Sequence, residues 1–322
     1  KHGTESIRWL ETFAAPFLIL MGLALLGWAY VNAGGFGEML STPSQFVEGG
    51  AKEGQFWTAF FAGLTSMVGF WATMALNIPD FTRFAKSQKD QMLGQAIGLP
   101  LPMALFAFIG VAVTSATVTI YGEAIWDPVA LAGRMGGMGV VLALAALALA
   151  TLTTNLAANM VAPAYGFSNM APSKISFKMG GYITAGIGVA IFPWKLLETA
   201  GGYLFTWLTG YSALLGPIAG ILIADYFILR KSTLNIDALF QHSGEYGANN
   251  GWNMAGVTAL VIGILPNISG FLHAAGFLES VPAVFDTLYA YAWFVGLIIA
   301  SMVYLLLSNR APVTMQAKSA SQ

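Results

Sequence analysis

Long apolar stretches separated by short polar segments dominate this chain. Crossing about 30 Å of hydrocarbon takes ~20 helical residues, and eight stretches of suitable length carry few charges. They run approximately over residues 12–32, 56–78, 95–120, 138–163, 179–197, 202–228, 253–272 and 287–308. The stretch 179–197 is rich in glycine and has Pro193 near its end, so its helix propensity is the weakest. The pattern predicts an all-α integral membrane protein with about eight transmembrane helices.

The lysines and arginines indicate how these helices are oriented. If the segment before the first span is cytoplasmic, alternation places eleven of the 14 basic residues inside. Only Lys52, Arg134 and Lys195 then lie outside, and this asymmetry is the one that the positive-inside rule expects. The eleven are Lys1, Arg8, Arg83, Lys86, Lys89, Lys174, Lys178, Arg230, Lys231, Arg310 and Lys318. The segment 309–322 becomes a cytoplasmic C-terminal tail.

Composition excludes several classes of protein. The chain is 57% hydrophobic and 9% charged, has a net charge of −1 and contains no cysteine. Nucleic acid is therefore not expected as a partner, and thiolate chemistry is excluded. Because the interiors of the predicted spans lack Asp, Glu, Lys, Arg and His, no catalytic pair can be assembled there, and an enzyme is not expected. The groups that remain are hydroxyls, amides and aromatic rings, which suit binding.

The second span has Gly69, Phe70 and Trp71 at its middle. A glycine beside two large aromatic residues at this depth could mark a break in the helix, where freed backbone groups face a cavity and a ring stacks on a planar ligand. Plain packing would use the same residue types. The sequence leaves both interpretations open.

The fourth span carries three hydroxyls and two amides within ten residues, 150–159. The hydroxyls of Thr153 and Thr154 and the carbonyl of Ala150 can offer oxygens to a small cation. Asn159 lies about 140° around the helix from Thr154 and presents a donor and an acceptor to an amide-bearing ligand. Interhelical hydrogen bonding, worth about 0.6 to 2 kcal/mol per contact, is the alternative.

At these two segments the chain resembles the nucleobase:cation symporter family, which includes cytosine, purine, uracil, thiamine, allantoin and hydantoin permeases. The resemblance covers nearly the whole chain. It includes the motifs at 7–9, 77–83, 153–159, 163–165, 216–217 and 224–227. It implies a leucine-transporter-like inverted-repeat fold, in which our eight predicted spans are the family's fifth to twelfth. Residues 1–322 would then be a single, partial transporter domain that lacks the first four spans, in the cell's inner (plasma) membrane.

The resemblance also implies roles for single residues. Trp71 matches a tryptophan that stacks on the substrate ring, Asn159 matches a substrate-binding asparagine, and Leu204 matches a residue of the outer gate. Ala150, Thr153 and Thr154 match sodium ligands. Phe70 replaces a glycine of the hydantoin transporter and narrows the pocket beside Gly69, whereas the run 77–86 is closer to the allantoin and uracil permeases.

The mechanism that the resemblance implies is symport by alternating access. Allantoin is the expected substrate, with uracil, cytosine and hydantoin as alternatives, and sodium is the expected coupling ion. Proton coupling would need a titratable group in the pathway. An uncoupled channel or uniporter, or a receptor without transport, would use the same fold. Besides the substrate and the lipid bilayer, no obligate protein partner is evident, and no cofactor beyond the coupling ion is expected.

Overall fold

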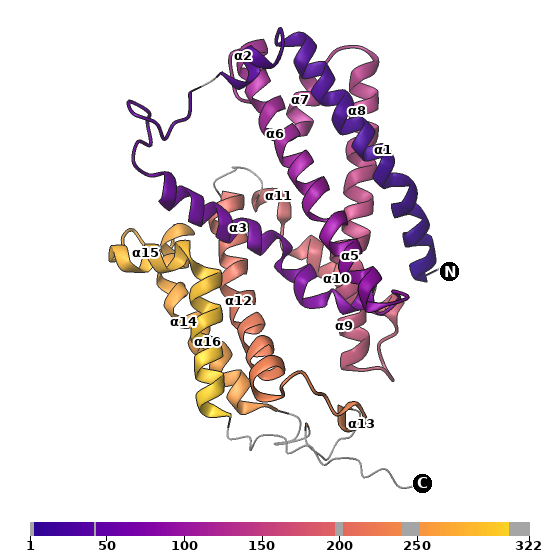
Figure 1. Cartoon of the computed structure of the whole chain (residues 1–322), viewed down its shortest axis with the longest axis vertical. Coiled ribbons are helices and arrows are strands. Elements are labelled where there is room, and N and C mark those ends of the chain that lie inside the picture. Colours follow the sequence, from indigo (N-terminus) through magenta and orange to yellow (C-terminus); the bar gives the residue numbers. More distant parts are fainter. Residues whose placement is uncertain (1–2, 42, 197–201, 240–245, 247–251, 309–322) are drawn as a thin grey trace. The chain divides into compact units, whose positions relative to one another are not determined.

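The computed structural model describes residues 3–41, 43–196, 202–239, 246 and 252–308 (Figure 1). The chain forms two compact units, and each is built from two separate stretches of sequence. Unit 1 comprises Lys1–Glu53 and Asn77–Ile191, and unit 2 comprises Gly54–Leu76 and Phe192–Gln322. The predicted tail 309–322 lies outside the described residues. All the regular structure in the described part of the chain is helical.

Among the described residues, six helical segments are long and apolar enough to cross a membrane, or seven if one bent pair counts as a span. They confirm seven of the eight predicted spans in place and order. The six straight segments are Trp9–Asn32, Phe56–Asn77, Gln88–Tyr121, Met138–Met170, Leu204–Leu229 and Met254–Ala274. The chain is therefore a multi-pass membrane protein.

The predicted span 179–197 is shorter than expected. Its helix, α10, covers Phe177–Ala190, and 14 residues rise only about 21 Å. Phe192 follows with a positive φ of 54°, a backbone conformation that ends a helix, and Pro193 opens the four-residue helix α11 (Pro193–Leu196). The helix therefore ends just before Phe192 and Pro193, whereas the glycines of this segment lie within it.

Unit 1 is organised around α1 (Gly3–Asn32), which packs against α6 (Pro100–Tyr121) and α8 (Met138–Thr154). Its helix α1 runs in the opposite direction to α8 (Figure 1). Gly22 allows a close approach, because a Cβ there would lie 2.9 Å from the Phe106 ring. The shorter helices of unit 1 are α2 (Phe36–Leu40), α4 (Pro79–Thr82), α5 (Gln88–Gly98) and α7 (Pro128–Arg134).

The end of α8 continues without a turn into η1 (Asn155–Val161) and then α9 (Ala162–Met170). The segment η1 is a π-helix, a wider form that is rare and frequently occurs at functional sites. The next helix, α10, packs on α9 at Gly180, where an added Cβ would collide with the backbone of Ala164.

Unit 2 consists of α3 (Phe56–Asn77, of which Asn77 is assigned to unit 1) and a C-terminal group of helices. That group contains η2 (Gly202–Leu208), α12 (Thr209–Ile223), η3 (Ala224–Leu229), α13 (Ile236–Leu239) and α14 (Met254–Ala274). It ends with α15 (Ala283–Ala290) and α16 (Ala292–Leu307), which meet at an angle of 87°. The last predicted span, 287–308, is therefore bent near its start.

Small residues allow the helices of unit 2 to pack closely. A Cβ added at Gly216 or Gly220 of α12 would collide with the backbone of α16, and one at Gly296 would lie 2.7 Å from Pro217. Close backbone approach through glycine and alanine is the usual way in which membrane helices associate. The glycines of α12 and α16 therefore permit the close contact between these two helices.

Candidate functional site

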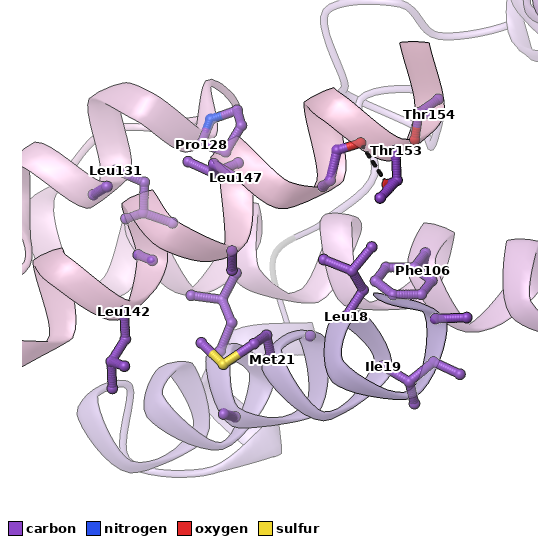
Figure 2. A pocket seen from close by; sticks show the side chains of 18 of the residues that line it. Leu18, Ile19, Met21, Phe106, Pro128, Leu131, Leu142, Leu147, Thr153 and Thr154 are labelled. Carbon is purple, nitrogen blue, oxygen red and sulfur yellow. Dashed lines mark hydrogen bonds between the residues drawn. The ribbon is translucent and has the colours of Figure 1, made fainter. Parts of the chain in front are cut away.

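A cavity of about 680 Å³ lies within unit 1, between one face of α1 and one face of α8 (Figure 2). Its wall is mostly apolar and includes Leu18, Met21 and Phe106. The three predicted cation ligands, Ala150, Thr153 and Thr154, line it together. A mostly apolar cavity with a few convergent polar groups is the usual form of a ligand-binding site.

Thr153 is the predicted cation ligand whose geometry is best defined. Its side chain is buried, and its hydroxyl donates to the carbonyl oxygens of Leu149 (3.0 Å) and Ala150 (3.1 Å). Because its proton points to its own helix, the hydroxyl oxygen keeps its lone pairs for an acceptor role. Thr154 is exposed at the same end of α8 and adds a second hydroxyl. The donor set consists of neutral oxygens, which suit a hard monovalent cation.

Asn159 lies in the π-helical segment η1 and is exposed. Its Nδ2 donates to Oδ1 of Asn155 (2.8 Å), and Nδ2 of Asn155 donates to the carbonyl oxygen of Thr151 (2.9 Å). This relay fixes the orientation of the Asn159 amide and uses one of its two N–H groups. The second N–H and the carbonyl oxygen remain for a ligand. Asn159 follows the cavity-lining residues of α8 along the chain but is not itself among them.

Trp71 and Phe70 lie in α3 of unit 2, with their rings 5.5 Å apart and nearly perpendicular. Phe70 is 46% exposed within the described part of the chain. The indole Nε1 of Trp71 is buried and has no hydrogen-bond partner among the described residues. A buried donor without a partner is costly.

The helix break considered at Gly69 is wrong, because α3 runs continuously from Phe56 to Asn77. Gly69 is buried, and an added Cβ would collide with Ser212 Oγ and with the carbonyl oxygen of Leu208. The glycine therefore permits close packing of α3 on the helix that follows η2, which is the packing interpretation that the sequence left open.

Leu204, the predicted gate residue, lies in the π-helix η2 of unit 2. Its carbonyl oxygen accepts hydrogen bonds from Ser66 Oγ (2.8 Å) and from Thr209 Oγ1 (3.3 Å). Tyr289 donates to the carbonyl oxygen of Thr206 in the same segment (2.9 Å). Hydroxyls from neighbouring helices thus bond backbone groups of the segment that would form the gate.

The predicted residues are divided between the two units. Unit 1 holds Ala150, Thr153, Thr154 and Asn159, all on the continuous helix α8–η1, whereas Gly69, Phe70, Trp71 and Leu204 belong to unit 2. The structure brings the three cation ligands to one cavity.

Sequence reasoning missed two residues of this region. Asn155 holds Asn159, and its spacing of four residues is the signal that would have identified it. Glu11 lines the cavity and lies inside the observed span Trp9–Asn32, whereas the predicted span began one residue later. Glu11 therefore lies at the edge of the span, outside the interval in which ionisable residues were predicted to be absent.

The helices and the cavity define the class of the protein as a multi-pass helical membrane protein with a cavity between the helices of unit 1. Residues 1–296 match the family described as "Permease for cytosine/purines, uracil, thiamine, allantoin". The chain belongs to this family of permeases, and not to a family of enzymes.

Individual relatives agree with this assignment. The chain is 48% identical to the purine-uracil permease NCS1 of Arabidopsis thaliana over 96% of its own length and 51% of the relative's. It is 42% identical to the allantoin permease of Bacillus subtilis (strain 168), over 97% of this chain and 61% of the relative. It thus spans about half to three fifths of the length of these relatives.

A solved structure of Mhp1, a nucleobase-cation-symport-1 family transporter in a closed conformation with bromovinylhydantoin bound, resembles the chain with a TM-score of 0.67 and 26% identity. The match covers 95% of this chain and 62% of that one. An inward-facing structure of Mhp1 gives a TM-score of 0.63 with 25% identity. The leucine-transporter-like fold implied by the sequence motifs is therefore confirmed.

Proposed function

We propose that this chain is the ring- and cation-binding part of a secondary transporter that imports a nucleobase-like compound by symport with sodium. The observation that carries the proposal is that Ala150, Thr153 and Thr154 line one cavity, with the Thr153 hydroxyl oriented as an acceptor. The cation would bind to these oxygens from α8. Its charge would then favour the conformation of α8–η1 in which the Asn159 amide is presented to the ring.

Allantoin is the substrate that we propose first. A ureido ring offers several N–H groups and carbonyl oxygens, which match the paired donor and acceptor of the Asn159 amide. The 42% identity to an allantoin permease supports this choice. Uracil is the second candidate, because the 48% identical relative is a purine-uracil permease. The bulk of Phe70 makes hydantoin a weaker candidate. We place the protein in the cell's inner (plasma) membrane.

The proposal is tested by uptake of radiolabelled allantoin into cells that express the gene encoding this chain, with and without a sodium gradient. Uracil, cytosine and hydantoin serve as unlabelled competitors. We expect sodium-dependent uptake that falls about tenfold in Asn159→Ala, the effect of losing about 1.4 kcal/mol of hydrogen bonding to the ring. Thr154→Ala should raise the sodium concentration needed for half-maximal uptake.

Thr151→Ala is the matched control for both variants. Thr151 lies on the same helix and is exposed, and its backbone carbonyl, not its hydroxyl, accepts the bond from Asn155. Uptake driven by a pH gradient without sodium would replace sodium by a proton in the proposal. Uptake that is equal with and without either gradient would indicate a uniporter or a channel, and no uptake inhibited by any of these rings would refute the substrate class.

A further inference from the structure

Glu11 is the one ionisable side chain among the described residues that line the cavity of unit 1. It belongs to the same face of α1 as Ala15, Leu18, Gly22 and Leu25, which also line the cavity and follow it at helical spacing. Glu11 therefore lies on the face of α1 that is otherwise apolar and that faces the cavity. A carboxylate that served only as a surface charge would be expected on the opposite, exposed face.

One carboxyl oxygen of Glu11, Oε1, is buried and lacks a hydrogen-bond partner among the described residues. Helix α1 packs against α6 and α8. Neither of these two helices contains Asp, Glu, Lys, Arg or His. On α1 itself the charged positions nearest in sequence are Glu5 and Arg8. Burying a carboxyl oxygen without a partner is costly, and an ionisable residue kept inside a membrane span indicates a functional site.

The same cavity holds the oxygens of the proposed cation site. Because α1 and α8 run in opposite directions, the N-terminal part of α1 lies beside the C-terminal part of α8 (Figure 1). Figure 2 shows Leu18, two helical turns after Glu11, near the end of α8 that carries Thr153 and Thr154. Glu11 therefore lies beyond Leu18 toward the end of α1 that the distribution of basic residues predicts to be cytoplasmic.

We propose that Glu11 is a second cation-binding residue, which receives the coupling cation at the cytoplasmic end of this cavity as it leaves Ala150, Thr153 and Thr154. This inference rests on the function proposed above. The carboxylate supplies the negative charge that the neutral oxygens of α8 lack, and so it lowers the electrostatic cost of moving a monovalent cation through an apolar wall. Both sodium and a proton can bind to a carboxylate, and the experiment distinguishes between these two cations.

The test compares net uptake with exchange in proteoliposomes that contain the purified wild type or Glu11→Gln. Net uptake of labelled allantoin requires the cation to be released inside, whereas exchange of labelled for unlabelled allantoin at equal sodium on both sides does not. We expect Glu11→Gln to lose net uptake about tenfold or more while exchange stays within about twofold of the wild type. Glu11→Asp, which keeps the charge, should restore most of the net uptake.

Controls separate this role from a structural one. Arg8→Gln tests whether a neighbouring charge on α1 is what matters, and it should leave the ratio of net uptake to exchange unchanged. A parallel fall of both activities in Glu11→Gln, or a net uptake equal to that of the wild type, would overturn the inference. A sodium gradient at equal pH and a pH gradient without sodium identify the cation. Wild-type vesicles without ring uptake would instead overturn the proposed function, and this inference with it.

Discussion

The spans that contain α8 and α12 use similar polar residues for different purposes. On α8 and η1, the side chains of Thr153, Asn155 and Asn159 bond to groups of their own helical segment. In unit 2, Ser212 of α12 instead donates to the carbonyl oxygen of Thr65 on α3. Ser66 of α3 in turn donates to the carbonyl oxygen of Leu204, in the span that contains α12. Burial follows the same division, since 6% of the most apolar window of Met138–Met170 is buried, against 39% of that of Leu204–Leu229.

The comparison shows that the partner of a hydroxyl is more informative than its presence. A hydroxyl bonded within its own helix leaves its lone pairs and that helical face for a ligand, whereas one bonded across an interface holds two helices together. We therefore expect substitutions in unit 2 to lower stability, and substitutions on α8 to alter binding.

The largest expected effect is on the buried ion pair of unit 2. Arg230 is 4% exposed, donates to Asp225 Oδ2 (2.6 Å) and lies over the ring of Tyr246, while Tyr304 donates to Asp225 Oδ1 (2.7 Å). Arg230→Met removes the guanidinium that pairs with the Asp225 carboxylate at 2.6 Å. We expect a loss of about 3 kcal/mol, or roughly 6 to 10 °C in the melting temperature of the detergent-solubilised protein.

Arg134→Met in unit 1 is the matched control. Arg134 pairs with Glu123 at 2.6 Å, but both side chains are more than half exposed. Solvent screens such a pair, so we expect less than about 1 kcal/mol. Equal losses in the two variants would contradict the contrast between the units.

The next effect concerns Gly69, where packing and ligand binding were both open from the sequence. Gly69→Ala would place a methyl group against the Leu208 carbonyl oxygen and Ser212 Oγ, and the Ser212 hydroxyl already donates to the carbonyl oxygen of Thr65. We expect a loss of about 1 to 3 kcal/mol from overpacking, measured as a lower melting temperature. Gly63→Ala on the same helix meets nothing within 4 Å and should be neutral or slightly stabilising.

A lower apparent affinity for the ring in Gly69→Ala, without a change in melting temperature, would instead place Gly69 at the ligand. It would also show that close packing of α3 does not depend on this residue.

Hydropathy sufficed to locate most of the spans, because an uncharged apolar run of ~20 residues has the length of a membrane-spanning helix. It could not give the length of α10 or the 87° angle between α15 and α16. Both depend on how freed backbone groups are satisfied. Thr65 Oγ1, for example, donates to the carbonyl oxygen of Ala290 at that angle (2.7 Å), from more than two hundred residues away. A pattern of apolar residues contains no information about such a contact.

The residues of the candidate site also fall into some that the sequence could indicate and some that it could not. Thr153 and Thr154 were identifiable as candidates because hydroxyls are unusual in an otherwise Ala- and Leu-rich helix, and Ala150 was added because the resemblance to the family implies it. Glu11 was not identifiable, because two residues after Trp9 an acidic side chain is typical of the membrane interface, and only the cavity shows that it faces inward. The three π-helical segments were not identifiable either, since a single extra residue in a helical turn leaves no mark on hydropathy.

The smallest expected effects come from removing one hydroxyl in each unit, and they test the difference between the units most directly. Tyr289→Phe removes the bond to the Thr206 carbonyl oxygen (2.9 Å) and should cost about 1 kcal/mol of stability, with the half-maximal sodium concentration unchanged. Thr154→Val keeps the shape of an exposed residue and should do the reverse, raising that sodium concentration several-fold at an unchanged melting temperature. If Tyr289→Phe also altered the sodium dependence, the hydrogen bonds to η2 would themselves take part in coupling. The contrast between binding by unit 1 and stabilising bonds in unit 2 would then be wrong.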